Sequence, residues 1–159
     1  MTERKLTIDF EEYSSAAEMA PGDQALVERA VGALAGSYSP YSRFKVGAAL
    51  LLENGKVIIG SNQENNSYPA GLCAERTAMF AAGANCPGVA FDTLAIVASH
   101  EGKLLEDPAT PCGICRQVMA EYQTKGGKPL KVILAGSRKI YKFSRVDDLL
   151  PLIFDSLKP

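Results

Sequence analysis

Residues 44–62, FKVGAALLLENGKVIIGSN, are the part of this chain that most constrains its fold. Two apolar runs flank Asn54-Gly55, a dipeptide that readily adopts the positive φ angles of a tight turn. This pattern predicts a β-hairpin, and it commits the chain to an antiparallel strand pair early in the sequence.

The segments around the hairpin predict an alternation of helices and strands. Before it, residues 21–37 form an amphipathic helix candidate that Asp23 can cap and Gly36 can end. After it, we expect helices at 73–84 and 112–122, strands at 92–98, 130–135 and 139–144, and a terminal helix near 146–157. Only GSR separates the last two strands, which is too short for a crossover, so this pair should be antiparallel.

These elements predict an α/β fold, a three-layer α/β/α sandwich. Strands separated by helices usually lie parallel, with the helices packed on the sheet. We expect a mixed five-stranded sheet whose last two strands are antiparallel. The length of 159 residues suits one domain, which we assign to residues 21–159. Residues 1–20 form an N-terminal extension of unknown role, in which Leu6, Ile8 and Phe10 either form a short strand or drape over the body.

The composition argues against several function classes, although it leaves a local basic patch possible. The net charge of -1 shows no basic surplus that would favour nucleic acid or an anionic membrane as a partner. No apolar run is long enough to span a bilayer, and the N-terminal MTERKLTIDFEEY lacks the apolar region of a secretory signal. We therefore expect a cytoplasmic protein with neither nucleic acid nor membrane as a partner.

Three of the four cysteines are placed as metal ligands would be. In a reducing cytosol, clustered cysteines are more often metal ligands or catalytic thiols than disulfides. Cys112-x-x-Cys115 alone fits a redox dithiol, half a zinc site or chance. Cys73 adds a third thiol at another helix start, where backbone N–H groups stabilise thiolates. We expect these three sulfurs to surround one zinc ion, and Cys86 to be a structural thiol.

Three protein ligands would leave a fourth zinc position open, which is the catalytic arrangement. The only histidine, His100, ends a strand and is best explained as a surface or loop residue. Glu75 is close enough to Cys73 to take a proton from a zinc-activated water, although the helix dipole alone also favours a glutamate there. Arg76 can offset the thiolate charge, or it is a solvated helix residue. CAE at 73–75 with PCGIC at 111–115 matches the signature of zinc nucleobase deaminases.

Longer motifs carry a family resemblance. With YSPYSRFKVGAAL, GSNQENNSYPAGLCAERTA, PCGICRQ and DLLPLIF, the chain resembles the small, homotetrameric cytidine deaminases from about residue 24 to residue 154. The resemblance implies zinc-dependent hydrolysis of cytidine and 2′-deoxycytidine to uridine and 2′-deoxyuridine, with ammonia released, in pyrimidine salvage. It also implies one zinc per chain, a free nucleoside as substrate, attack at C4 of cytosine and proton transfer by Glu75.

The resemblance assigns substrate contacts as well. Phe44 would pack on the pyrimidine face, although a core-facing aromatic residue is a plainer explanation. Asn62 and Glu64 would bind ribose hydroxyls, where an ordinary turn would also place polar residues. The backbone around Ala74 would hold the base carbonyl.

Two aromatic residues would act between subunits. Tyr68 and Phe154 would complete a neighbouring subunit's pocket, or they are ordinary interface or core residues. Thr110 stands where the family often has serine, near the departing amino group, and we expect no chemical consequence. Residues 155–159 extend past the late phenylalanine and can alter how it enters the next site.

Three other functions compete with this one. A polynucleotide deaminase usually has histidine as its first ligand, and Cys73, the near-neutral charge and the short final strand link argue against it. A deaminase of nucleoside-like antibiotics fits less well because of NQEN and the late phenylalanine. A zinc-stabilised or redox protein without enzymatic activity is disfavoured by the missing fourth ligand and by Glu75.

Overall fold

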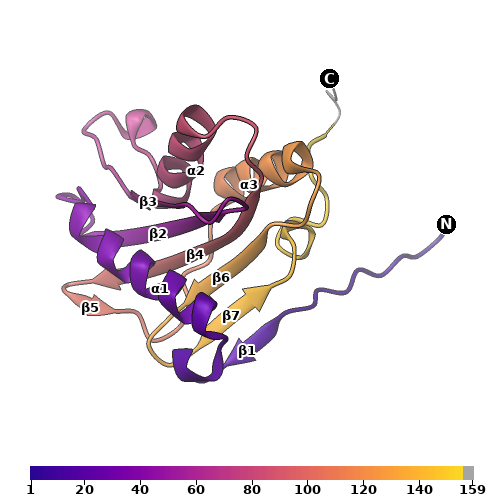
Figure 1. Cartoon of the computed structure of the whole chain (residues 1–159), viewed down its shortest axis with the longest axis horizontal. Helices are drawn as coiled ribbons and strands as arrows, with labels where there is room; N and C mark the ends of the chain where they lie inside the picture. Colours follow the sequence, from indigo (N-terminus) through magenta and orange to yellow (C-terminus); the bar gives the residue numbers. More distant parts are fainter. Residues whose placement is uncertain (156–159) are drawn as a thin grey trace.

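The computed structural model describes residues 1–155 and forms one mixed α/β structure (Figure 1). The strands are β1 (Glu11–Tyr13), β2 (Phe44–Leu52), β3 (Val57–Ser61), β4 (Phe91–His100), β5 (Lys103–Leu104), β6 (Lys131–Ala135) and β7 (Ile140–Phe143). The α-helices are α1 (Pro21–Ala33), α2 (Ala74–Asn85) and α3 (Gly113–Gly126). The sheet order is β1-β7-β6-β4-β2-β3, and β5 pairs with β4 outside this path.

The hairpin that the sequence predicts is present. Strands β2 and β3 pair antiparallel from Gly47 opposite Ser61 to Leu51 opposite Val57. Gly55 has a φ of 82°, in the left-handed region that glycine adopts without steric cost. The Asn54 side chain accepts a 3.1 Å hydrogen bond from the Lys56 N–H group. The turn residues therefore set the register of the pair, as the dipeptide indicates.

The predicted strand directions are confirmed, but the number of strands was wrong. Strand β6 lies parallel to β4, and β7 lies antiparallel to β6. All five expected strands occur, and β1 and β5 make a seven-stranded sheet. Both extra strands are very short: β1 pairs with the free edge of β7, and β5 pairs with the end of β4 at Ser99 and His100, beyond the last pair that β4 makes with β6. Segments this short carry no apolar alternation by which the sequence could reveal them.

The sheet is the middle of three layers. Helix α1 lies on one face, and α2 and α3 cover the other (Figure 1). Successive strand side chains point to opposite faces, so Leu94 and Ile96 pack with α2 and α3 while Ala95 and Val97 pack with α1. This double burial explains why the central strands are apolar at nearly every position.

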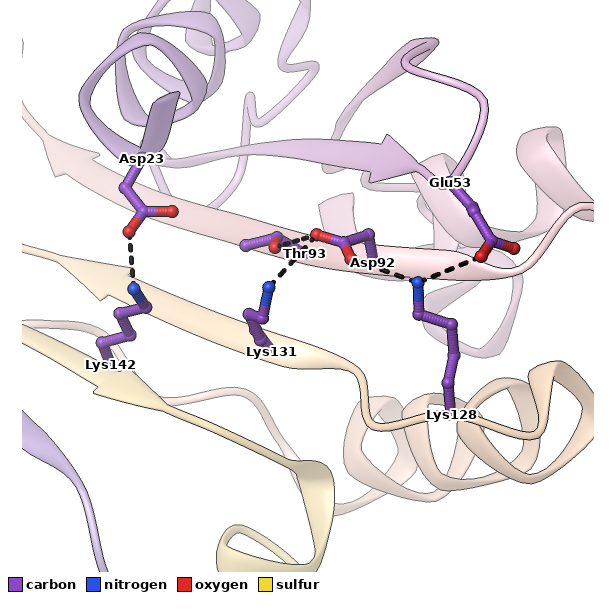
Figure 2. A network of polar contacts seen from close by, with 7 residues as sticks. All are labelled: Asp23, Glu53, Asp92, Thr93, Lys128, Lys131 and Lys142. Carbon is purple, nitrogen blue, oxygen red and sulfur yellow. Dashed lines mark hydrogen bonds and ion pairs between the residues drawn. The ribbon is translucent and has the colours of Figure 1, made fainter. Parts of the chain in front are cut away.

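Helix α1 (Pro21–Ala33) forms where it was predicted, but Asp23 does not cap it. Ala20 is the N-cap residue and Pro21 takes the first helical position, where its missing N–H group costs no hydrogen bond. Asp23 instead lies in the first turn of the helix and forms an ion pair with Lys142 of β7, with 2.6 Å between Oδ2 and Nζ (Figure 2). This contact joins the helix to the sheet.

A second group of ion pairs joins the N-terminal ends of β4 and β6. Figure 2 shows Asp92 between Lys128 and Lys131, at 3.3 and 3.6 Å, with Lys128 also 3.5 Å from Glu53. The Thr93 hydroxyl donates a 2.8 Å hydrogen bond to Asp92. Asp92 lies at the N-terminal end of β4. These ion pairs are therefore far from the side chains at the carboxyl end of the same strand.

The expected terminal helix is absent from the described residues. A 3-10 turn at Val146–Asp148 replaces it, and residues 149–155 have no helical structure. Pro151 accounts for the difference, because proline lacks an N–H group and disfavours helical geometry in the residue before it. Residues 156 and 157 of the expected helix lie outside the described part.

Residues 1–10 neither form the predicted strand nor lie over the body. They extend away from the sheet edge as an irregular trace (Figure 1), and Leu6 and Ile8 are exposed. Only Phe10 packs closely, with its ring stacked on Phe143 at a centroid distance of 5.3 Å. Pairing with β7 begins at Glu11. The division into residues 1–20 and 21–159 stays a prediction.

Candidate active site

The sheet topology brings the starts of α2 and α3 to one edge. Strands β3 and β4 both run antiparallel to β2, so they share a direction, and β6 is parallel to β4. Helix α2 follows β3 and helix α3 follows β4, so both helices begin at the carboxyl ends of these strands. This edge is where open α/β sheets bind their ligands.

Close packing of α2 on β3 depends on Gly60. A Cβ atom at this position would lie 2.4 Å from the Ala74 carbonyl oxygen and 2.5 Å from the Ala78 nitrogen. Both are backbone atoms of the helix, so they cannot move aside as a flexible side chain could. The absent side chain therefore allows the first turn of α2 to lie directly on the strand.

Three thiols meet where the two helices begin. Cys73 is the N-cap residue of α2, Cys112 is the N-cap residue of α3, and Cys115 lies in the first turn of α3. Their sulfur atoms all lie within 4.8 Å of one another. A tetrahedral zinc ion with Zn–S bonds of about 2.3 Å places its sulfur ligands about 3.8 Å apart. The thiolate donor set and its spacing therefore fit a zinc ion.

The charges around the thiols favour a thiolate. A hydrogen bond from Cys115 lowers the pKa of Cys73 to about 5, and Arg76 adds to this shift against the opposing effect of burial. The pKa of Cys115 is raised in turn, because its thiol donates that hydrogen bond and is buried. The Arg76 guanidinium lies at the cluster, 3.5 Å from the Cys73 sulfur.

Glu75 is buried beside this cluster. The residue lines a cavity at this end of the sheet, yet it is only 5% exposed. Burial raises the pKa of Glu75, and the negative charge of Cys73 adds to the rise. A carboxyl group in such surroundings takes up a proton more readily than one in water, as acid–base chemistry near neutral pH requires.

One cavity of about 720 Å³ connects these groups with the start of β2 and the end of β3. The residues predicted for the site that line it are Phe44, Asn62, Glu64, Tyr68, Cys73, Glu75, Arg76, Thr110 and Cys112. Three others do not line it: Ala74, Cys115 and Phe154. The first two are fully buried directly behind the cavity wall. Phe154 is 65% exposed on the C-terminal segment.

Asn62 has little hydrogen-bonding capacity left. Its carbonyl oxygen accepts bonds from the Ser37 hydroxyl at 2.6 Å and the Val46 N–H group at 2.8 Å. Its amide nitrogen donates to the Phe44 carbonyl oxygen at 2.9 Å. A primary amide has two N–H donors and one oxygen with two lone pairs. Asn62 can therefore offer a ligand one N–H group and no further acceptor.

Glu64 organises the loop before β2. Its carboxylate accepts hydrogen bonds from the Tyr41 and Ser42 N–H groups and from the Ser42 hydroxyl. These bonds lower the pKa of Glu64, most strongly through the Ser42 hydroxyl. An ionised carboxylate has about four acceptor positions, so one remains for a ligand hydroxyl.

Sequence reasoning missed the role of the 38–43 loop in shaping this end. Tyr41 and Ser42 line the cavity and bind Glu64, although the sequence motifs gave neither a function. Arg43 has a φ of 56°, an uncommon conformation for a residue with a side chain. Such outliers concentrate where a fold holds functional residues in place. The available signal was the motif YSPYSRF itself, whose polar residues directly precede Phe44.

Comparison with protein families identifies the chain. Residues 21–127 match the family described as the cytidine and deoxycytidylate deaminase zinc-binding region. The chain belongs to this deaminase family. The zinc that the family binds is the ion that the three clustered thiols fit. The matched region contains the three clustered thiols and all the residues that line the cavity.

Named relatives of the deaminase family agree. The chain is 50% identical over 131 residues to a cytidine deaminase of Halalkalibacterium halodurans, covering 82% of this chain and 92% of the relative. It is 42% identical over 125 residues to a cytidine deaminase of Mycobacterium tuberculosis, covering 79% and 84%. The crystal structure of cytidine deaminase from Burkholderia pseudomallei superposes with a TM-score of 0.69 at 44% identity, covering 86% of this chain and 100% of that one.

Within residues 1–155, none of the helices has the length and apolar character that crossing a bilayer requires.

Proposed function

We propose that this deaminase hydrolyses cytidine and 2′-deoxycytidine to uridine and 2′-deoxyuridine and releases ammonia. One observation carries the proposal: the buried Glu75 lies beside three clustered thiols in a cavity whose other end presents Asn62 and Glu64. The names of the relatives given above support cytidine as the substrate. We further propose that Cys73, Cys112 and Cys115 hold the zinc ion, one per chain.

Zinc bound to these thiolates would supply one kind of chemistry, the activation of the attacking water at neutral pH. In the reaction, the water oxygen bonds to C4 of cytosine and the bond from C4 to the amino nitrogen breaks. Glu75 accepts one proton from the water and delivers it to N3, and then transfers the remaining proton of the C4 hydroxyl to the departing amine, so that ammonia leaves and a carbonyl forms at C4. Its raised pKa supports this role, because the carboxyl group can hold the proton between the two transfers.

The base is proposed to lie against Phe44, with its carbonyl oxygen near the backbone of Ala74. Phe44 is partly buried and lines the cavity, so its ring can cover one face of a pyrimidine. Thr110, at the cavity wall, is proposed to lie near the departing amino group. These contacts would orient C4 toward the thiol cluster, and orientation of this kind lowers the entropic part of the barrier.

The ribose is proposed to bind between Asn62 and Glu64. One free N–H group of Asn62 and one free acceptor position of Glu64 match the acceptor and donor of a single hydroxyl group. A pair that serves one hydroxyl does not require both the 2′ and the 3′ hydroxyls. This stoichiometry supports the use of both ribose and deoxyribose nucleosides.

The active protein is proposed to be a homotetramer in the cytoplasm. Tyr68 lines the cavity while 80% exposed, and Phe154 is 65% exposed, so neither ring is covered by its own chain. A neighbouring subunit would bury both and close the cavity against water.

Ammonia release tests the substrate. The purified, zinc-loaded protein is incubated in turn with cytidine, 2′-deoxycytidine and a short cytosine-containing oligonucleotide. We expect ammonia from both nucleosides and none from the oligonucleotide. Release from the oligonucleotide alone would favour a polynucleotide deaminase, and no release from any of them would favour a protein without this activity. Sedimentation of the same sample tests the assembly, and a fully active monomer would contradict it.

A further inference from the structure

The C-terminal segment is held in place by α3. Residues 149–155 have no helix or strand of their own. The Gln117 side chain nevertheless binds both backbone polar groups of Phe154: its amide nitrogen donates to the carbonyl oxygen at 2.8 Å, and its oxygen accepts from the N–H group at 3.1 Å. One side chain therefore fixes this residue as a neighbouring strand would.

A second contact fixes the beginning of the same segment. The Arg116 guanidinium donates 2.8 Å hydrogen bonds to the carbonyl oxygens of Pro111 and Leu149. Arg116 and Gln117 directly follow Cys115 in the sequence. The first turns of α3 thus carry two of the clustered thiols and both anchors of the C-terminal segment.

The anchored segment packs some of its apolar side chains inward and leaves others exposed. Leu149 is buried and Ile153 packs against the main core, whereas Leu152 and Phe154 are 81% and 65% exposed. Ile153 and Gln117 therefore hold the backbone while the Phe154 ring points outward. A fixed backbone loses less conformational entropy when its side chain docks on a partner.

We propose that Gln117 is a positioning residue that presents the Phe154 ring to the cavity of a second copy of this chain. The proposal rests on the function and assembly proposed above. The second copy is the chosen partner because its cavity is open where Tyr68 is exposed, and because Phe154 does not line the cavity of its own chain. Gln117 itself would not touch substrate; it would act through Phe154.

Steady-state kinetics of single and double variants test this role. Gln117→Ala should raise KM for cytidine about tenfold, the effect of about 1.4 kcal/mol, and leave kcat and zinc content unchanged. Phe154→Ala should raise KM at least as much. The double variant should be no worse than Phe154→Ala alone, since residues acting through one another are not additive. Gln24→Ala on α1 is the control, because it loses one similar 2.8 Å bond, to the Met19 carbonyl oxygen just before the helix, and KM should not change.

Gln117→Glu adds a graded case. Its carboxylate keeps an acceptor for the Phe154 N–H group but loses the donor, so its KM should lie between those of the original protein and Gln117→Ala. An unchanged KM in Gln117→Ala, or additive effects in the double variant, would overturn the proposal.

Hydrogen exchange separates this proposal from the function on which it rests. Amide exchange at residues 152–155 in the assembled protein should be faster in Gln117→Ala than in Gln24→Ala. Slow exchange in both variants would overturn the role of Gln117, whatever the substrate is. If the unsubstituted protein did not deaminate cytidine, that result would instead count against the proposed function alone.

Discussion

The Nη2 atom of Arg76 lies 3.5 Å from the Sγ atom of Cys73. The Nε atom of the same guanidinium is buried without a hydrogen-bond partner in the described residues. The contact with the thiolate raises the pKa of Arg76 and helps lower that of Cys73. Arg76 thus provides positive charge at a cluster that would otherwise accumulate negative charge.

Replacing this charge should weaken zinc binding. In Arg76→Gln, the pKa of Cys73 should rise, and zinc affinity at neutral pH should fall about 10–100-fold, the usual effect of removing a residue that supports metal ligands. Competition with a chelator between pH 6 and 8 measures this, with the larger loss expected at the lower pH because the thiol is then more often protonated. Arg29→Gln, an exposed change on α1, should have no effect. Equal affinities in the two variants would contradict the role of Arg76.

Removing one thiol should remove the metal. Cys112→Ala leaves two sulfurs, too few for the proposed site, and metal analysis should find zinc strongly reduced from about one per chain. Cys86→Ala is the matched control, because Cys86 belongs to the hydrophobic core and not to the thiol cluster. Full zinc content in Cys112→Ala would exclude this ligand set.

Glu75→Gln should separate turnover from folding. The amide keeps the size of the side chain but cannot transfer the proton, and general acid–base catalysis is typically worth about 10²–10⁴-fold. Burial already disfavours the charged form of Glu75, so the neutral variant should bind zinc and unfold at a denaturant concentration no lower than before. Ammonia release and urea unfolding measure the two properties. Near-normal turnover in the zinc-loaded variant is incompatible with the proposed mechanism.

Adding a methyl group at Gly60 should disturb the start of α2. In Gly60→Ala, the Cβ atom would lie within 2.5 Å of backbone atoms of the helix, and overpacking of this kind costs about 1–3 kcal/mol. Zinc affinity should fall as well, because Cys73 moves with the helix. The same change at Gly32 of α1 meets no atom within 4 Å and should stabilise the protein by up to about 1 kcal/mol. Chemical unfolding of both variants checks the contrast, which equal stabilities would refute.

The ion pairs of Asp92 should depend on pH. Burial alone would raise the pKa of Asp92, but the hydrogen bond from Thr93 and the charges of Lys128 and Lys131 outweigh it, so the pKa is lowered. A lowered carboxyl pKa stabilises the fold above the ordinary value of about 3.9, and this stabilisation is lost as pH falls through the lowered pKa. Asp92→Asn should therefore reduce the free energy of unfolding by about 1 kcal/mol at pH 7.

Urea unfolding at a series of pH values checks this. The difference between the two proteins should shrink as the medium becomes acidic, while zinc loss at low pH affects both equally. A difference that is constant with pH would show that Asp92 acts through packing and not through its charge.

Local chemistry made much of this protein predictable from its sequence. Asn54-Gly55 specifies its turn through backbone conformations that few other pairs adopt, and the short GSR link permits only an antiparallel pair. The helices predicted to begin at Cys73 and Cys112 do begin there, with each cysteine at the N-cap position. These features depend on neighbours in the chain, so the chain alone reveals them.

Other features depend on partners that are distant in sequence. Strand β1 exists because β7 offers a free edge, and Asp23 pairs with Lys142 instead of capping its own helix. The segment after Val146 has no helix, and its backbone instead accepts a hydrogen bond at Leu149 from Arg116 of α3, 33 positions away. Gln117 and Phe154 are 37 positions apart, and no local pattern links them. Such contacts arise only when packing of the whole sheet and its helices brings distant polar groups within about 3 Å, where desolvation obliges them to pair.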